Sequence, residues 1–317
     1  MTRWGASLVL FHTDPALAAR CVAALRAQDP PPERVHVVCN DDAAGAGAAD
    51  LAGVTVEAHA ANLGYAGGHN AALAALFAAG LDAVLVVNPD AVPAPDAVAR
   101  LAAFTGDRAV LAGPLLELLR PDGTPEGLVD SAGIRWTASA RHLDARQGSP
   151  LANAPVAPAE VAGISGACLW VTRAAYERVV AASGEFFDEE FVAYREDAEL
   201  GFRARLLGVP SWLVPDARVG HGRALRGTTR AVAPHVNRLG VQNRFLIAFK
   251  YGRRRPGRLP AALARDAVVV AAVLLRERSS LPGLRRAWAL RGTQRAKGRR
   301  VLAASAERAA AAPTLDA

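Results

Sequence analysis

Short apolar runs alternate with helix-forming stretches through the first third of the chain, and this pattern limits the possible folds more than any other feature. The runs lack polar alternation, which is typical of strands buried on both faces of a parallel sheet. We therefore predict an α/β fold, an open and mostly parallel sheet with helices on both faces. The expected strands are 6–11, 35–39, 54–58 and 83–87, and the expected helices are 14–27, 69–79 and one that opens at Pro95-Asp96.

Polar residues stand where three of these strands end. His12, Asn40 and Asp90 each lie at or just beyond the carboxyl end of a predicted strand. Ligands of such sheets bind beyond the carboxyl ends of the strands, so we expect these three residues to converge on one crevice.

The middle of the chain is less regular. Residues 114–160 are rich in proline, glycine and polar side chains, which indicates loops with one hairpin near 133–138. Beyond them we expect regular structure to return at 161–171, followed by short strands at 211–214 and 217–220, helices at 173–182 and 196–207, and basic helices after residue 230.

The charge is divided unevenly along the 317 residues. Residues 1–221 contain 16 arginines and 26 acidic residues, a net −10, whereas residues 222–317 contain 21 basic and 4 acidic residues, a net +17. The overall +7 suggests a nucleic-acid binder, but an acidic body argues against that class. We predict a body at 1–225 and a basic helical region at 226–317.

Cysteine usage and hydropathy indicate a cytoplasmic protein. Cys21, Cys39 and Cys168 form no CxxC pair, which fits a reduced compartment. The N-terminus lacks the features of a secretory signal. The longest purely apolar stretch of the basic region, 267–275, is too short to span a bilayer.

Two segments of the body could bind a nucleotide or its phosphates. Asn88-Pro89-Asp90 ends a strand, and a carboxylate there suits a hard divalent cation that binds a diphosphate. The alternative is an ordinary turn with Asp90 capping the next helix. Residues 62–68 are a glycine-rich loop before a helix, where backbone N–H groups favour anions. The alternative there is a plain turn.

Two further positions carry titratable groups. Glu196 and Asp197 fall at a predicted helix N-terminus, where the helix dipole favours a carboxylate that can act as a general base. Helix capping is the alternative. His221 follows a strand and suits Mn²⁺ better than Mg²⁺, although a single histidine is more often structural.

Together these segments resemble the ordered motifs of family 2 glycosyltransferases with a GT-A fold, and most of all a bacterial rhamnosyltransferase-like branch. The resemblance covers about residues 6–225. The motifs are Asn62-Leu-Gly-Tyr-Ala-Gly-Gly-His-Asn70, Val-Val-Asn-Pro-Asp90, Gly163-Ile-Ser-Gly-Ala, the stretch from Phe-Asp-Glu-Glu-Phe to Glu-Asp197-Ala-Glu-Leu-Gly-Phe-Arg, and Val-Pro215-Asp-Ala-Arg-Val-Gly-His221.

The resemblance implies a role for each matched position. Asp90 matches the metal-binding DxD motif, His221 a later metal ligand, and Asp197 the catalytic base. The cofactor would be Mg²⁺ or Mn²⁺. The positions expected around the nucleotide sugar and its acceptor are His12, Asn40, Asp41, Asn62, Gly64, Gly68, Asn70, Asn88 and Glu196.

The sequence departs from the family pattern at two strand ends. Cys39 replaces the usual aspartate that reads the pyrimidine base, and a thiol cannot accept a hydrogen bond as a carboxylate does. Base recognition would then fall to Asp41, Asp42 or the backbone. His12-Thr13-Asp14 also replaces the more usual Tyr-Asn.

The resemblance implies an inverting transfer of a sugar, foremost L-rhamnose from dTDP-rhamnose, onto a hydroxyl of a cell-envelope glycan or polyprenyl-linked saccharide. Galactofuranosyl or another hexosyl transfer is the alternative within the family. Outside it, the alternatives are a silent sugar-nucleotide-binding protein and a nucleic-acid binder that uses the basic region.

The basic region has two competing interpretations. Its apolar stretches beside clustered arginines fit a helix lying on an anionic membrane, at the inner face of the cell membrane. The alternative is an extension that packs on the body or forms a homodimer.

Overall fold

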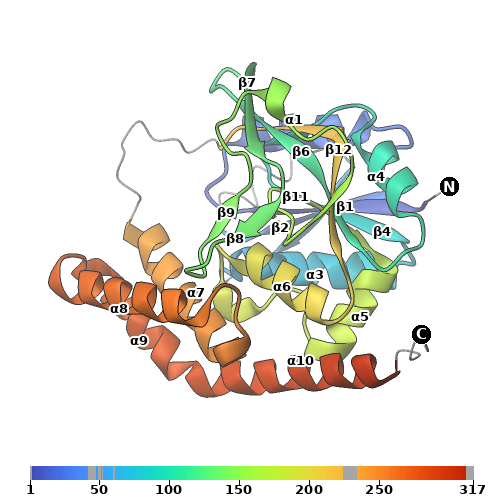
Figure 1. The fold of residues 1–317 in the computed structure, drawn as a ribbon. Helices are drawn as coiled ribbons and strands as arrows, with labels where there is room; N and C mark the ends of the chain where they lie inside the picture. The colour runs from blue at the N-terminus through green and yellow to red at the C-terminus, as the bar shows by residue number, and fades with distance from the viewer. Residues whose placement is uncertain are drawn as a thin grey trace.

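The protein is described from a computed structural model that covers residues 2–41, 48, 51, 53–59, 61–223 and 234–311. A central sheet is covered by helices on both faces, and further C-terminal helices lie beneath one of these faces (Figure 1). Within those residues, no helix has the length and hydropathy needed to cross a membrane.

The central sheet is mixed, with a parallel half built from the N-terminal strands. The order is β10-β12-β6-β11-β4-β1-β2-β3, with β5 pairing β12 and β7 pairing β6. β3, β2, β1 and β4 run parallel, whereas β11 is antiparallel to both neighbours. The strands are β1 Trp4–Leu10, β2 Arg34–Cys39, β3 Thr55–Ala58, β4 Ala83–Val87, β5 Ala91–Pro93, β6 Leu111–Leu119, β7 Pro125–Ser131, β8 Ile134–Trp136, β9 His142–Asp144, β10 Ala159–Val161, β11 Cys168–Thr172 and β12 Ser211–His221.

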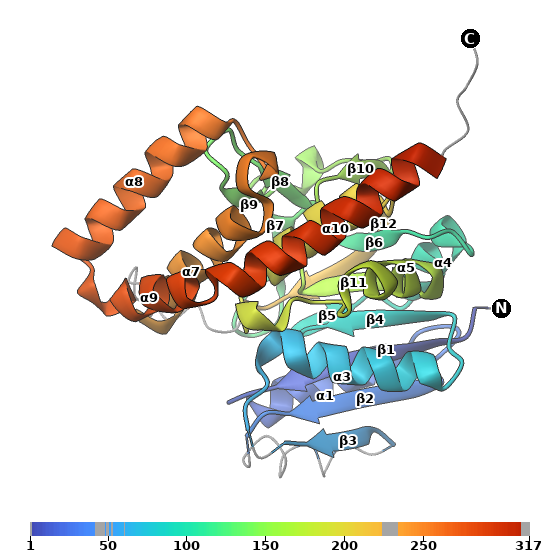
Figure 2. The same ribbon diagram turned by 90° about the horizontal axis from the view of Figure 1, so that it is seen from below.

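The helices divide between the two faces, as expected. α1 and α4 pack on one face, around Leu25, Val98 and Leu101. α3, α5 and α6 pack on the other. α10 packs against α5, α6, α7 and α9, and α3 lies beside these C-terminal helices, not beneath them (Figure 2). The helices are α1 Pro15–Arg26, α3 Gly64–Ala78, α4 Ala97–Thr105, α5 Arg173–Ser183, α6 Glu196–Leu206, α7 Pro234–Tyr251, α8 Leu259–Leu275, α9 Leu281–Ala289 and α10 Arg291–Ala311.

Two predictions about local structure are wrong. The helix expected at 69–79 already begins at Gly64, so the glycine-rich loop is its first turn. Part of the segment expected to be irregular is strand, because β6 extends through Pro114 to Leu119 and β7 pairs with it. The hairpin expected near 133–138 corresponds to β8 and β9, which pair from Ile134 to Asp144.

The C-terminal helices contact the body through buried ion pairs. Nζ of Lys250 on α7 lies 2.8 Å from Oδ2 of Asp188 and 2.7 Å from Oε1 of Glu199. Nζ of Lys297 on α10 lies 2.6 Å from Oδ1 of Asp188 and 2.5 Å from Oε1 of Glu185. Burial alone would raise the pKa of Asp188, but the two ammonium groups lower it well below its usual range. The described helices of the basic region therefore neutralise carboxylates that precede and follow the start of α6.

Candidate active site

Asp90 and His221 lie together where β4 and β12 end. Oδ1 of Asp90 is 3.3 Å from Nε2 of His221, and the amide nitrogen of Asn88 is 3.5 Å from the same ring nitrogen. The backbone N–H of Gly222 donates to the carbonyl of Asp90 at 3.0 Å, which joins the two strand ends. The sequence placed these residues in one site, and the structure puts them in contact.

An acidic and basic cluster that the sequence did not reveal fixes His221. Nδ1 of His221 is 2.7 Å from Oδ2 of the fully buried Asp130. Arg223 binds Asp130 as well, and it donates to Oδ2 of Asp144 at 2.7 Å. Burial lowers the pKa of His221, but its bonds to Asp130 and Asp90 outweigh that effect and raise the pKa to about 9. Asp130 lies 91 residues from His221, in a segment without a motif, so no local signal marks it.

Asp90 and His221 fit a divalent cation as a pair of protein ligands. When Nδ1 of His221 carries the proton toward Asp130, its Nε2 presents a lone pair toward Asp90, an arrangement that orients metal-ligating histidines. In the ranges that the structure describes, no group of three or more His, Cys, Asp or Glu side chains is placed to hold a metal. A Mg²⁺ or Mn²⁺ ion with two protein ligands would complete its shell with phosphate oxygens and water.

Glu196 and Asp197 open α6, where Glu196 is buried and Asp197 is partly exposed. Oδ2 of Asp197 accepts the backbone N–H of Gly166 at 3.0 Å, and its Oδ1 accepts that of Ala198 at 2.7 Å. Oε2 of Glu196 is buried with no hydrogen-bond partner. Burial raises the pKa of Asp197 to about 6, and burial beside Asp197 raises that of Glu196 well above its usual range. Asp197 is therefore the member that holds the negative charge.

A strained loop leads into this pair. Val192, Tyr194 and Arg195 have φ of 62°, 68° and 68°, a left-handed conformation that is rare for residues other than glycine. The buried Asn243 on α7 holds the loop, because its amide nitrogen lies 2.7–2.9 Å from the carbonyl oxygens of Phe191, Ala193 and Tyr194. Asn243 is thus a positioning residue for Glu196 and Asp197.

We expect Asn243→Leu to lower kcat by roughly ten- to a hundredfold, because small displacements of reacting groups are costly. It should also destabilise the protein by about 1–3 kcal/mol, since three carbonyls, that of the buried Phe191 among them, lose their donor. Steady-state kinetics and thermal denaturation measure both effects. Asn153→Leu, on the exposed surface, is the matched control. An unchanged kcat at a lowered melting temperature would make Asn243 purely structural.

The residues expected around the donor include several that tie the N-terminal end of α3 to neighbouring elements. Asn40 donates to the carbonyl of Gly64 at 3.0 Å and accepts from the N–H of Leu63 at 3.2 Å. Oδ1 of Asn62 accepts the N–H of Gly64 at 2.7 Å. At Gly64 a φ of 70° and a carbonyl 2.6 Å from any added Cβ require glycine. At Gly68 an added Cβ would lie 2.8 Å from a side-chain carbon of Val9, so this position favours glycine as well.

His12 and Asp41 form a second contact at this edge. The backbone N–H of His12 donates to Oδ2 of Asp41 at 2.7 Å, while the His12 side chain is mostly exposed. Asp42, the other acidic residue considered for reading the base, lies outside the described residues. The donor-binding roles of His12 and Asp41 stay predictions.

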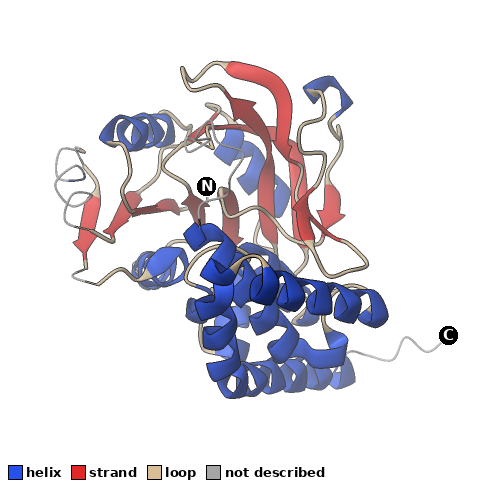
Figure 3. Cartoon of the chain, turned by 90° about the vertical axis from the view of Figure 1, so that its left-hand side faces the viewer, coloured by secondary structure: helices blue, strands red, loops and turns tan. Residues whose placement is uncertain are grey.

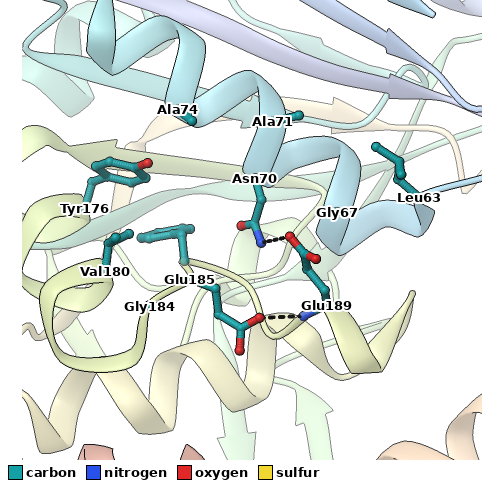
Figure 4. Close-up of a pocket in the computed structure, with 11 residues that line it drawn as sticks. Leu63, Gly67, Asn70, Ala71, Ala74, Tyr176, Val180, Gly184, Glu185 and Glu189 are labelled. Atoms are coloured by element: carbon teal, nitrogen blue, oxygen red, sulfur yellow. Dashed lines mark hydrogen bonds between the residues drawn. The ribbon is translucent and has the colours of Figure 1, made fainter. Parts of the chain in front are cut away.

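Asn70 lines a cavity beside α3. Its amide donates to the carbonyl of Phe187 at 2.9 Å. It also donates to Oε1 of Glu189 at 3.0 Å (Figure 4). The cavity has a volume of about 390 Å³, and Asn70 and Glu189 line it. Among the described residues, none of Asp90, Asp197 and His221 lines this cavity. Asn70 thus connects α3 to the segment before α6.

Backbone contacts join the metal-binding pair to the acidic pair. The N–H of Asn88 donates to the carbonyl of Ala167 at 3.0 Å, next to Gly166, which donates to Asp197. The hydroxyl of Tyr65 donates to the carbonyl of Gly166 at 2.7 Å. The charge of Asp144 also contributes to the raised pKa of Asp197. The segments around residues 65, 88, 166 and 197 therefore form one site at the carboxyl ends of the strands.

Comparison with known families identifies the class of protein. Residues 9–242 match the family described as "Glycosyltransferase like family 2". The chain belongs to family 2 of the glycosyltransferases. It is 33% identical over 203 residues to the N-acetylglucosaminyl-diphospho-decaprenol L-rhamnosyltransferase of two Mycobacterium tuberculosis strains, CDC 1551 / Oshkosh and H37Rv. The match covers 56% of this chain and 61% of the relative's length.

Solved structures share the fold. GalNAc-T7 with UDP, GalNAc and Mn²⁺ superposes with a TM-score of 0.64 at 14% identity, covering 89% of this glycosyltransferase and 54% of that chain. TarS of S. aureus gives a TM-score of 0.50 at 15% identity, covering 96% and 55%. These likenesses confirm the GT-A fold, and the family match confirms a glycosyltransferase of family 2.

Proposed function

We propose that this glycosyltransferase moves L-rhamnose from dTDP-L-rhamnose, with inversion, onto a hydroxyl of a polyprenyl-diphosphate-linked saccharide or a related cell-envelope glycan. The similarity to the mycobacterial L-rhamnosyltransferase carries this proposal. The acidic pair at the start of α6 supports the reaction class, because one member keeps its charge while the other is held neutral.

In the proposed reaction Asp197 takes the proton of the acceptor hydroxyl. The oxygen forms a bond to the anomeric carbon as the bond from that carbon to the diphosphate breaks, and the diphosphate leaves with the electron pair. Gly166 and Ala198 hold the Asp197 carboxylate in place through their N–H groups. A divalent cation held by Asp90 and His221 would supply charge neutralisation of the diphosphate.

The test is transfer by the purified full-length protein with Mn²⁺, a synthetic polyprenyl-diphosphate N-acetylglucosamine acceptor, and labelled donors. We expect product from dTDP-L-rhamnose and none from UDP-galactofuranose, with the new linkage of inverted anomeric configuration by NMR. Product only from UDP-galactofuranose would replace the sugar in the proposal but keep the reaction. If a donor binds but no sugar is transferred to this acceptor, the result contradicts the proposed acceptor class.

The proposed cation makes a separate prediction. Asp90→Ala should lower kcat/KM by roughly a hundredfold and raise the Mn²⁺ concentration needed for half-maximal activity, because one of two protein ligands is lost. Asp96→Ala, an exposed carboxylate at the start of α4, is the control. Full activity in a chelator would contradict metal dependence.

The proposed acceptor also places the protein in the cell. A polyprenyl-linked saccharide resides in a bilayer, so the enzyme would work in the cytoplasm at the inner face of the membrane, as a peripheral protein with a nucleotide-sugar donor. The similarity to a decaprenol-dependent relative supports this location.

A further inference from the structure

The outward side of α8 is apolar along its whole length. Helical spacing puts Leu263, Val268, Leu274 and Leu275 on that side, and all four are exposed, Leu275 to 79%. Alanines fill the gaps between them at 264, 267, 271 and 272, and these are exposed as well. A helix on the surface of a soluble domain normally carries charged residues on this side.

The charged residues of α8 lie off this apolar face. Asp266 turns inward and binds Arg244 at 2.7 Å and Arg255 at 2.5 Å. Arg265 is exposed at one edge of the face, and Arg276 follows the last turn at the same edge. Ala262 and Val273 are buried on the opposite side, so the orientation of the helix is fixed by its packing.

Basic residues surround the apolar face. Arg253, Arg254 and Arg258 precede α8 and are exposed, and Arg278 follows it. Between residues 252 and 300 the acidic residues are Asp266 and Glu277, of which Glu277 accepts from Ser280. Trp288 on the next helix is 60% exposed, packed against Arg291. An apolar strip with a cationic border and an aromatic residue is the pattern of a helix that lies in a membrane interface.

The α8 face, meaning the outward residues 263–275 with the arginines around them, projects from the body. Figures 1 and 2 both place α8 at the outer margin, at the end of the molecule opposite the start of β1, and Figure 3 shows the C-terminal helices from that side. β1 and β2 run toward this same end, which bears the candidate site. A surface that meets the α8 face is thus on the side where an acceptor would enter.

We propose that the α8 face docks this glycosyltransferase onto an anionic bilayer, with α8 in the plane of the interface. The inference deepens the proposed membrane location, on which it rests, by assigning the surface that makes the contact. The arginines favour anionic lipid headgroups and oppose a second copy of this chain, because pairing two such faces would bring their cationic borders together.

Vesicle sedimentation of the full-length protein tests the proposal, because it needs neither donor nor transfer. We expect binding to vesicles of phosphatidylglycerol and phosphatidylcholine, and weak binding to phosphatidylcholine alone. Val268→Glu with Leu275→Glu should weaken binding by at least about tenfold, since charge replaces apolar contact. Val156→Glu, at a valine that is 85% exposed and lies outside the face, is the control and should bind as the wild type does.

Two further measurements complete the test. Arg265→Gln with Arg276→Gln should weaken binding to the anionic vesicles, and more so at low salt, while Arg100→Gln should not. Thermal denaturation verifies that each variant is folded. Vesicle binding that survives the Val268 and Leu275 changes would overturn the proposal. The proposal would also be overturned if neither protein bound vesicles and light scattering showed a dimer for the wild type and a monomer for the Val268 and Leu275 variant. If the wild-type protein binds anionic vesicles but transfers no sugar, the result contradicts the proposed reaction and leaves the proposed docking surface standing.

Discussion

Asp197→Asn should reduce kcat roughly a thousandfold and leave the affinity for the donor within about a factor of three. The amide oxygen can still accept the hydrogen bond of Gly166, which now lies 3.0 Å from the carboxylate, while the contact with the N–H of Ala198 is lost. What is lost is the basicity needed to take the acceptor proton. Transfer kinetics measure kcat, and calorimetry with the intact nucleotide sugar measures donor binding.

Two further variants serve as a control and a comparison for Asp197→Asn. Glu177→Gln removes an exposed carboxylate on α5 and should leave kcat unchanged. Glu196→Gln imitates the neutral form that burial favours, and it should cost far less than Asp197→Asn. If Glu196→Gln proves the more damaging change, the base is Glu196 and the division of charge within the pair is reversed.

The pH profile gives independent evidence on the same group. Because burial raises the pKa of Asp197 to about 6 and a base must be ionised to act, kcat should rise as pH increases through about 6 and level off above it. The residual activity of Asp197→Asn should lack this step. A profile with the same midpoint in both proteins would assign the titration to another group.

The parallel half of the sheet was predictable because its signals are local. The apolar runs that became β1, β2 and β4 are continuous, and Asp14 caps α1 by accepting the N–H of Ala16. β6 was missed because Pro114 lies in its interior, where proline is normally excluded from a paired strand. The structure tolerates it where β12 is irregular, since the register shifts between Val214 and Arg218 opposite Pro114 and Leu115.

The residues of the candidate site also fall into two groups, those marked by local sequence signals and those revealed only by the structure. Asp90, Asp197 and His221 were found because each stands in a short motif at the end of a strand or the start of a helix. Asp130 acts on His221 across 91 positions, and Asn243 acts on the loop before Glu196 across about 50, with nothing in their own neighbourhoods to mark them. Arg223 is close to His221 in sequence, but the carboxylates that it binds, Asp130 and Asp144, are distant. Asn243 also lies beyond the segment that resembles the family motifs. Only the folded chain brings it to the loop before Glu196.

Lys250→Met should destabilise the protein by about 3 kcal/mol, because it leaves carboxylates in the interior without one of their cations. The ammonium lies 2.8 Å from Asp188 and 2.7 Å from Glu199, and the Lys250 side chain is 1% exposed. Methionine preserves the length and apolar stem of the side chain, so the charge is the main difference. At this chain length the melting temperature should fall by about 5 °C.

The matched control is Arg100→Met, which breaks the exposed pair between Arg100 and Asp96 and should cost less than about 1 kcal/mol. Equal melting temperatures for the two variants would contradict a stabilising role of the buried network. A much larger fall in melting temperature for Lys250→Met would show that ion pairs between the acidic body and the basic region stabilise the fold. Asp188 and Glu199 belong to the acidic body and Lys250 to the basic region, so part of the separation in sequence is cancelled where the two pack together. The arginines around α8 lie outside that network, and their charge remains available to an anionic surface.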